Sequence, residues 1–369
     1  MKIIFAAGGT GGHVNPALAV AGFIREQYKD TQILFVGTKD KIESKLVPAA
    51  GFEFQSIEIS GFQRKLSVDN IKRNALTIKR LLSSTAHAKR IIEDFCPDVV
   101  VGFGGYVSGP VLYEAQKLKI PTAIHEQNAF PGITNKALAK KVDIVMLADG
   151  RAQQHLKSKN PCMVTGLPVR RELTEANGEF ARVELGLDDR PLILSMGGSL
   201  GARAINEAVC ELIAEMPDRC NYIHAMGQYG LWVPDKLKEL GVDLKGRRNI
   251  ILREYIDDMH RCMPAADLVI CRSGASTLSE LQALGKASIL IPSPNVSENH
   301  QYHNAMSLVN NEAAIVIEEK DLKDRRLIKE VSSLINNKTY MEKLKINAKS
   351  MAVLDSINKI SDIIVKLHV

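Results

Sequence analysis

The residues best suited to chemistry lie near the start of the chain, in the motif GGTGGH, which ends at His13. The apolar residues 3–5 predict a buried strand before the motif, and Pro16 marks a helix start after it. Backbone N–H groups at such a turn attract phosphate, and a histidine there can act as a general base near neutral pH. His13 is therefore a candidate base, although a histidine in such a place is more often a surface or capping residue.

A second candidate is the segment LVICRSGASTLSEL, from Leu268 to Leu281. An apolar strand brings Ser273 to the start of a helix whose N–H groups could hold a diphosphate. Glu280, one turn further along, could accept hydrogen bonds from ribose hydroxyls. The alternative is that Thr277 and Glu280 form a capping box that only ties back their own helix end.

Two further loops follow predicted strands. The motif HEQN places Glu126 after His125 as another carboxylate and imidazole pair, although polar residues at strand ends commonly just hydrogen-bond their loops. The residue types leave open whether His13 or Glu126 is the base. The motif GGSLGA, 197–202, could contact phosphate or could be a tight turn in which glycines allow close packing.

The sequence predicts neither a metal nor a cofactor. No Asp-x-Asp motif occurs, and Asp257 and Asp258 lie at a predicted helix start, where carboxylates act as caps. Arg170 or Arg203, together with backbone N–H groups, would then stabilise a diphosphate leaving group. The six cysteines are irregularly spaced, which predicts free thiols rather than disulfides or a zinc site.

The elements that must position these loops alternate between strands and helices. Strands are expected at 32–36, 99–101, 121–125, 192–195, 222–225, 249–252, 268–271, 288–291 and 314–317. Such alternation predicts parallel sheets whose ligands sit outside the carboxyl ends of the strands. A glycine motif opens each half, so we expect an α/β protein with two Rossmann-like domains facing each other across a cleft. Val14 replaces the third glycine of the dinucleotide fingerprint, which disfavours a dehydrogenase.

The length of 369 residues suits two domains, and prolines with a glycine around 158–168 mark the boundary between them. We expect a first domain over 1–164 and a second over 165–345. No apolar run approaches the roughly 20 residues of a membrane span, and the N-terminus lacks the apolar region of a signal peptide. These features predict a cytosolic protein.

The positive charge is unevenly distributed. Eight Lys or Arg residues lie between Arg64 and Arg90, interleaved with apolar residues, against the single acid Asp69. A basic amphipathic helix of this kind can lie on an anionic membrane surface. The alternatives are a solvated helix face or a nucleic-acid contact. Nucleic acid is disfavoured because aromatic residues make up only 5% of the chain.

Together the motifs GGTGGH, GGYVSGP, HEQN, GGSLGA, EYIDDM and CRSGASTLSE resemble the MurG family, the lipid-linked N-acetylglucosaminyltransferases of peptidoglycan synthesis, nearly end to end and in the same order. The resemblance implies the GT-B fold. It also implies inverting transfer of N-acetylglucosamine (GlcNAc) from UDP-GlcNAc to the 4-hydroxyl of undecaprenyl-diphospho-N-acetylmuramoyl-pentapeptide (lipid I). A last helix, 346–369, would return to the first domain.

The resemblance also implies site residues, and it matches His13 to the base proposed for the family. Contacts to UDP-GlcNAc fall on Thr10, Gly11, Gly12, Asn128, Arg170, Ser199, Ile256, Ala275, Ser276, Thr277, Leu278, Ser279, Glu280 and Gln301. The loop facing the acceptor diphosphate corresponds to Gly104, Gly105, Tyr106 and Ser108. The first domain would hold the enzyme on the cytoplasmic face of the membrane as a peripheral protein.

Two other functions fit the same architecture. A UDP-GlcNAc 2-epimerase shares the two domains and the donor but needs no membrane surface. A nucleotide-sugar-binding membrane protein without turnover would close on its ligand and transfer nothing.

Overall fold

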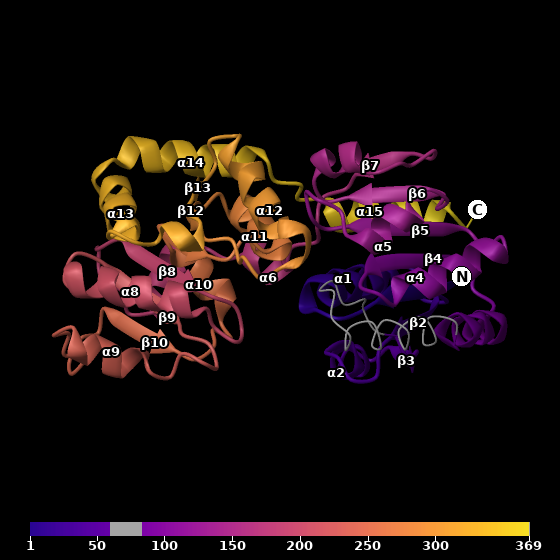
Figure 1. The fold of residues 1–369 in the computed structure, drawn as a ribbon, viewed down its shortest axis with the longest axis horizontal. Coiled ribbons are helices and arrows are strands. Elements are labelled where there is room, and N and C mark those ends of the chain that lie inside the picture. Colours follow the sequence, from indigo (N-terminus) through magenta and orange to yellow (C-terminus); the bar gives the residue numbers. More distant parts are fainter. Residues whose placement is uncertain (60–82, 369) are drawn as a thin grey trace, which may run out of the picture. The chain divides into compact units, whose positions relative to one another are not determined.

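The computed structural model describes residues 1–59 and 83–368, which form two compact units (Figure 1). The first unit comprises Met1–Pro168 with Val353–Val369, and the second comprises Val169–Ala352. Each unit contains one wholly parallel sheet, with helices between successive strands. The predicted α/β class with two Rossmann-like domains is therefore confirmed.

The sheet of the first unit has the strand order β3-β2-β1-β4-β5-β6-β7. Its strands are β1 Lys2–Ala7, β2 Gln32–Gly37, β3 Glu53–Ser56, β4 Val99–Gly104, β5 Thr122–Glu126, β6 Ile144–Leu147 and β7 Cys162–Val164. Its helices are α1 Gly11–Gln27, α2 Glu43–Ala49, a helical segment over 83–95, α4 Ser108–Lys117, α5 Ile133–Leu138, η1 Gly150–His155 and α15 Ser356–Lys366. The central strands are almost continuously apolar, so each face of the sheet packs into a hydrophobic cluster. The strand order reverses between β1 and β4, which is where ligands bind in sheets of this kind.

The sheet of the second unit has the order β10-β9-β8-β11-β12-β13, with the same reversal between β8 and β11. Its strands are β8 Leu192–Met196, β9 Asn221–Ala225, β10 Ile250–Arg253, β11 Leu268–Cys271, β12 Ala287–Leu290 and β13 Ile315–Val316. Its helices are α6 Arg171–Thr174, α7 Gly178–Glu184, α8 Arg203–Glu215, α9 Val233–Glu239, α10 Met259–Ala265, α11 Ala275–Leu284, η2 Ser297–Asn299, α12 His300–Val309, η3 Glu319–Asp321, α13 Arg326–Asn336 and α14 Lys338–Ser350.

The C-terminal segment contains two helices where one was expected over 346–369. Helix α14 belongs to the second unit and ends at Ser350, and the chain enters the first unit at Val353 before α15 begins. In the first unit, α15 packs on α1, with Ile360 and Ile364 fully buried. Leu354 is 62% exposed because it lies in the turn before α15.

The membrane expectations fall partly on residues that are not described. Within 1–59 and 83–368, no helix is both long enough and apolar enough to cross a bilayer. Most of the basic segment, including Arg64 to Arg80, lies outside the described residues. Of its cations, Lys89 and Arg90 are described, both are exposed, and Lys89 pairs with Glu93 at 3.5 Å.

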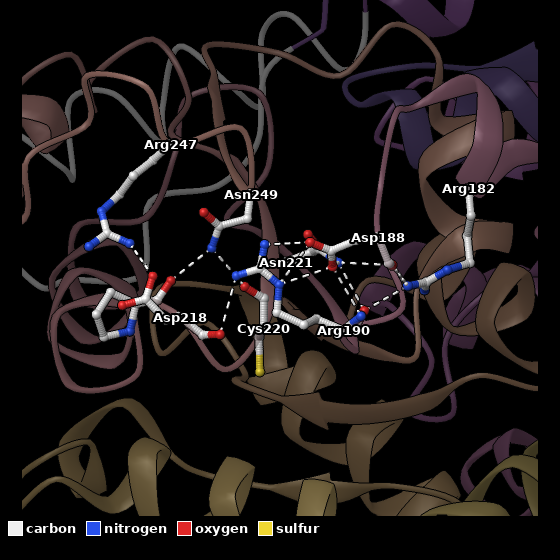
Figure 2. A network of polar contacts seen from close by, with 9 residues as sticks. Arg182, Asp188, Arg190, Asp218, Cys220, Asn221, Arg247 and Asn249 are labelled. Atoms are coloured by element: carbon white, nitrogen blue, oxygen red, sulfur yellow. Dashed lines mark hydrogen bonds and ion pairs between the residues drawn. The ribbon is translucent and has the colours of Figure 1, made fainter.

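A polar network ties together the amino ends of strands β8, β9 and β10 (Figure 2). Arg190 pairs with Asp188, whose backbone carbonyl and carboxylate accept hydrogen bonds from Asn221 at the start of β9. The Arg190 guanidinium holds the pKa of Asp188 well below its usual range. Asn249, just before β10, donates to the backbone carbonyl of Cys220. These contacts satisfy polar groups at the end of the sheet opposite to the glycine loops.

Arg182 of α7 links this network to the start of β11. It donates to the carbonyls of Asp188 and Arg190 at 2.8 and 2.6 Å and to Asp267 Oδ2 at 2.9 Å. Replacing Arg182 by Ala removes these three charge-assisted hydrogen bonds, so we expect a loss of about 2 kcal/mol of unfolding free energy. Urea denaturation, monitored through the unfolding transition of the second unit, measures this change in unfolding free energy.

The matched control is Arg171→Ala, which removes an ion pair with Glu175 whose arginine side chain is 85% exposed. Solvent screening should keep that loss below about 0.5 kcal/mol. Equal losses in the two variants would contradict a structural role for the network.

Candidate active site

The glycine loop between β1 and α1 begins at Gly8, and α1 starts at Gly11. Thr10 is extended, and its carbonyl accepts hydrogen bonds from the N–H groups of His13 and Val14 at 3.1 and 3.2 Å. No hydrogen bond from the Thr10 side chain caps the helix, and its first turn contains no acidic residue. The positive end of the α1 dipole is therefore not neutralised by an acid of that turn.

A buried carboxylate, that of Glu43, holds this loop in place, and the sequence does not predict it. Glu43 is fully buried, and its Oε2 accepts from the Gly9 N–H at 3.1 Å while Oε1 accepts from the Thr38 N–H at 3.0 Å. A Cβ added at Gly8 would lie 2.6 Å from Glu43 Oε1. No local motif marks Glu43, because its role depends on α2 lying beside the ends of β1 and β2.

The His13 side chain lies between two neighbouring loops. Its Nδ1 is 3.0 Å from Gln127 Oε1, in the loop after β5. Gly104, at the end of β4, also lies beside this ring, because an added Cβ there would be 2.6 Å from the same Nδ1. Three of the predicted loops, those containing His13, Gly104 and Glu126, therefore share one edge of the sheet, as expected for parallel strands in the order β1-β4-β5.

Glu126 occupies a different environment from that of His13. Its side chain is buried, and both carboxylate oxygens accept hydrogen bonds within its own loop. Oε1 accepts from the Asn128 N–H and Nδ2 at 2.9 and 3.1 Å, and Oε2 accepts from the Gly132 N–H and Asn135 Nδ2 at 3.1 and 2.8 Å. These four contacts orient Asn128, one of the residues expected to contact the donor.

The loop from Gly104 to Ser108 combines buried and exposed groups. Ser108 Oγ is fully buried, lies 3.0 Å from the carbonyls of Ala6 and Gly104, and thereby connects the ends of β1 and β4. A Cβ at Gly105 would lie 2.4 Å from the Gly8 carbonyl oxygen, so the two glycine loops are in contact. Tyr106 is 54% exposed and is the side chain of this loop available to a ligand.

In the second unit, α11 starts at Ala275, with Gly274 as its N-cap and no capping bond from a side chain. Thr277 is therefore already inside the helix, and the capping box considered from the sequence is wrong. Ser273, just before the helix, is fully buried, and its Oγ has no hydrogen-bond partner among the residues described. The exposed N–H groups of this first turn can bind an anion.

Glu280 bonds to Arg170 instead of to its own helix end. Arg170 Nε donates to Glu280 Oε1 at 3.0 Å, and Nη2 lies 2.9 Å from the same oxygen. The Glu280 side chain is only 14% exposed, and burial raises its pKa, with Arg170 opposing the rise. Oε1 is thus used by the arginine, which leaves Oε2 to accept from a ligand.

The remaining predicted contacts of the second unit lie around the carboxyl ends of its strands. Ser199 is exposed at the tip of the loop after β8, where Gly201 has a φ of +83° and packs against the backbone of Gly227. This close approach explains the glycine, and it leaves Ser199 available to a ligand. Ile256 is 4% exposed, after β10, and Gln301 Oε1 accepts from the Ser293 N–H at 2.9 Å.

Few of the described residues are candidates for metal binding or thiol chemistry. Within residues 1–59 and 83–368, no group of three or more His, Cys, Asp or Glu side chains could hold a metal ion. The six cysteines are free, and four of them are buried.

The geometry agrees with comparisons to known proteins. The family model described as "Glycosyltransferase family 28 N-terminal domain" matches residues 3–147. The model described as "Glycosyltransferase family 28 C-terminal domain" matches residues 192–360. The chain belongs to glycosyltransferase family 28. This confirms the family expected from the loop motifs.

Relatives match over nearly their whole length. A protein of Acetivibrio thermocellus named UDP-N-acetylglucosamine--N-acetylmuramyl-(pentapeptide) pyrophosphoryl-undecaprenol N-acetylglucosamine transferase is 44% identical over 367 residues, which cover 99% of this chain and 97% of that protein. A Bacillus cereus protein of the same name, numbered 1, is 41% identical over 370 residues, covering 100% and 99%.

Solved structures support the GT-B fold. The crystal structure of Acinetobacter baumannii MurG matches with a TM-score of 0.78 and 29% identity, covering 99% of both chains. A UDP-GlcNAc 2-epimerase from Neisseria meningitidis matches with a TM-score of 0.66 at 14% identity, which shows a shared fold alone.

Proposed function

We propose that the protein transfers GlcNAc from UDP-GlcNAc to the 4-hydroxyl of the muramyl sugar of lipid I, giving lipid II for peptidoglycan synthesis. The observation that carries this proposal is the 44% identity, over 99% of the chain, to a transferase named for this reaction. The expected consequences are roles in cell wall biogenesis, cell shape and cell division.

In the proposed mechanism, His13 removes the proton from the acceptor hydroxyl as that oxygen attacks the anomeric carbon of GlcNAc. Attack from the side opposite UDP gives inversion. The N–H groups at the start of α11 then stabilise the charge that develops on the diphosphate. Glu280 Oε2 accepts hydrogen bonds from the ribose hydroxyls.

The choice of His13 over Glu126 as the base rests on hydrogen bonding. The Glu126 oxygens accept four donors from their own loop, so taking up a proton there would break contacts that hold Asn128. The neutral imidazole of His13 has one nitrogen that can accept a proton. Its other nitrogen is beside Gln127.

We assign the acceptor to the first unit and most of the donor contacts to the second. The first unit would bind the acceptor diphosphate through Gly104, Gly105, Tyr106 and Ser108, and contribute Thr10, Gly11, Gly12 and Asn128 to the donor. The second would bind UDP-GlcNAc through Arg170, Ser199, Ile256, Ala275, Ser276, Thr277, Leu278, Ser279, Glu280 and Gln301. Basic residues between Arg64 and Arg90 would hold the enzyme peripherally on anionic lipid at the cytoplasmic face of the membrane.

The test is incubation with radiolabelled UDP-GlcNAc and a short-chain lipid-linked muramyl acceptor. Label that enters the lipid fraction only when both are present supports transfer. Conversion of UDP-GlcNAc to its 2-epimer without any acceptor would instead identify an epimerase. Binding of UDP-GlcNAc with no chemical change would identify a binding protein without turnover.

The contact between Gly104 and His13 gives a sharper test of the first unit. In Gly104→Ala the new methyl group would lie 2.6 Å from His13 Nδ1, and Gly104 has a φ of +103°, which strains any other residue. Because the ring must move by roughly 1 Å, we expect kcat to fall about 100-fold. Steady-state kinetics of the transfer reaction measure this.

Gly22→Ala is the matched control. Gly22 lies inside α1, and nothing lies within 4 Å of an added Cβ. Since Ala favours a helix interior, kcat should change by less than about twofold. A Gly104→Ala enzyme with normal kcat would show that the His13 position does not matter for turnover.

A further inference from the structure

We propose that Gln127 is a positioning residue that sets the tautomer of His13, so that Nδ1 carries the hydrogen and Nε2 accepts the proton from the acceptor hydroxyl. This inference rests on the proposed function, because it concerns the base of that reaction. Gln127 belongs to the HEQN motif, but neither its residue type nor its position in the sequence indicates the contact with His13. The hydrogen bonds around it do.

The direction of the Gln127 amide is determined by its neighbours. The side chain is buried, and Nε2 donates to the backbone carbonyls of Phe103 and His125 at 2.8 and 3.0 Å. Exchanging the amide N and O would place Oε1 against two carbonyl oxygens, neither of which can donate. Oε1 must therefore be the atom that faces His13.

The hydrogen bonds of His125 support the same orientation of the Gln127 amide. Its Nε2 lies 2.9 Å from the carbonyl oxygen of Gly166, so that nitrogen must carry a hydrogen. Complete burial lowers the pKa of His125 to about 4, which keeps the ring neutral near pH 7. Its Nδ1 then has a lone pair, which faces Gln127 Nε2 at 3.2 Å. The ring also stacks on Phe103 at a centroid distance of 5.3 Å, which restrains its rotation.

The hydrogen at His13 follows from this chain of contacts. Gln127 Oε1 can only accept, so His13 Nδ1, at 3.0 Å, must donate. In a neutral imidazole the lone pair is then on Nε2, the nitrogen that would take the proton. A Cβ at Gly104 would lie 2.6, 2.8 and 3.2 Å from Nδ1, Cε1 and Cγ of the same ring, so a residue without a side chain is needed beside it.

The same contact stabilises the product of proton transfer. When His13 becomes an imidazolium, its Nδ1–H bond to Gln127 Oε1 becomes charge-assisted and therefore stronger. Gln127 itself stays neutral throughout, so its buried side chain takes no charge. In serine proteases, the partner of the catalytic histidine orients the ring and fixes its tautomer in the same way.

Gln127→Met is the test variant, because Met has a similar length but its sulfur is only a weak acceptor for the hydrogen on Nδ1. Loss of the preferred tautomer should lower kcat about 100-fold, while KM for UDP-GlcNAc changes by less than about threefold. Gln154→Met is the matched control. Gln154 is an exposed glutamine of the same unit whose Nε2 lies 3.3 Å from His155 Nε2, and its loss should leave kcat unchanged.

A spectroscopic measurement separates positioning from a merely structural role. In ¹⁵N-histidine-labelled wild-type protein without substrate, and with the His13 signal assigned by its loss in His13→Ala, we expect a protonated Nδ1 and an unprotonated Nε2. Gln127→Met should move this signal toward the other tautomer. A wild-type ring with the hydrogen on Nε2 overturns the proposal even if the variant does not fold. So does an unaltered kcat in Gln127→Met.

This measurement also distinguishes the inference from the proposed function. If wild-type protein transfers no GlcNAc but His13 shows a protonated Nδ1, the proposed function fails and the hydrogen-bond arrangement stands. If transfer occurs with the hydrogen on Nε2, the function stands and the role of Gln127 fails.

Discussion

His13→Ala is expected to lower kcat for transfer about 1,000-fold, within the range usual for loss of a general base. The dissociation constant for UDP-GlcNAc should change by less than about threefold, because the α11 start and Glu280 belong to the other unit. Single-turnover transfer assays measure the first quantity, and calorimetric titration with UDP-GlcNAc measures the second.

The matched control is His155→Ala, which removes an exposed histidine of the same unit whose ring contacts that of Phe130 at a centroid distance of 4.6 Å. Its kcat should stay within about twofold of wild type. An unchanged kcat in His13→Ala would remove His13 from the mechanism and return Glu126 to consideration as the base.

Glu280→Ala is expected to weaken UDP-GlcNAc binding about 10- to 100-fold. The lost Oε2 would accept charge-assisted hydrogen bonding from the ribose hydroxyls, which together contribute about 1.5 to 3 kcal/mol. Arg170 is 53% exposed, so losing its partner should cost little by itself. Calorimetric titration with UDP-GlcNAc measures the dissociation constant, and the acceptor KM should remain near its wild-type value.

The pH dependence gives the same residue a second signature. Burial raises the pKa of Glu280, and only the carboxylate form accepts on both oxygens. The affinity of the wild-type protein for UDP-GlcNAc should therefore fall as the pH decreases, beginning at a higher pH than an ordinary glutamate would give.

Glu330→Ala is the control for Glu280→Ala, since Glu330 is also paired with an arginine, Arg326, on α13. Affinity lost equally in both variants would exclude a direct contact by Glu280.

The sequence predicted the repeated strands well because they are buried on both faces. Each strand expected in the second unit overlaps an observed one, from β8 to β13. The edge strand β3 was missed, since Glu53–Ser56 is largely polar. Pro16 suggested a helix start five residues later than Gly11, because a proline is tolerated inside the first turns of α1.

The candidate site was predictable where a motif marks it and not where distant elements create it. His13 and Ala275 follow glycines after strands, which is a local pattern. The roles of Glu43 and Gln127 depend on which strands are neighbours in the sheet, and no spacing in the sequence contains that information. The partner of Glu280 was missed for the same reason, because Arg170 lies 110 residues away.

The polar network at the amino ends of β8 to β10 separates two properties that are often in conflict when enzymes are engineered. Its arginines and asparagines lie at the end of the second sheet opposite to Ser199 and Glu280. Asp218 and Arg247 form an ion pair in the same network. Substitutions that raise heat resistance can therefore be sought around this pair without disturbing turnover. A search for inhibitors would concentrate on the other end of the same strands.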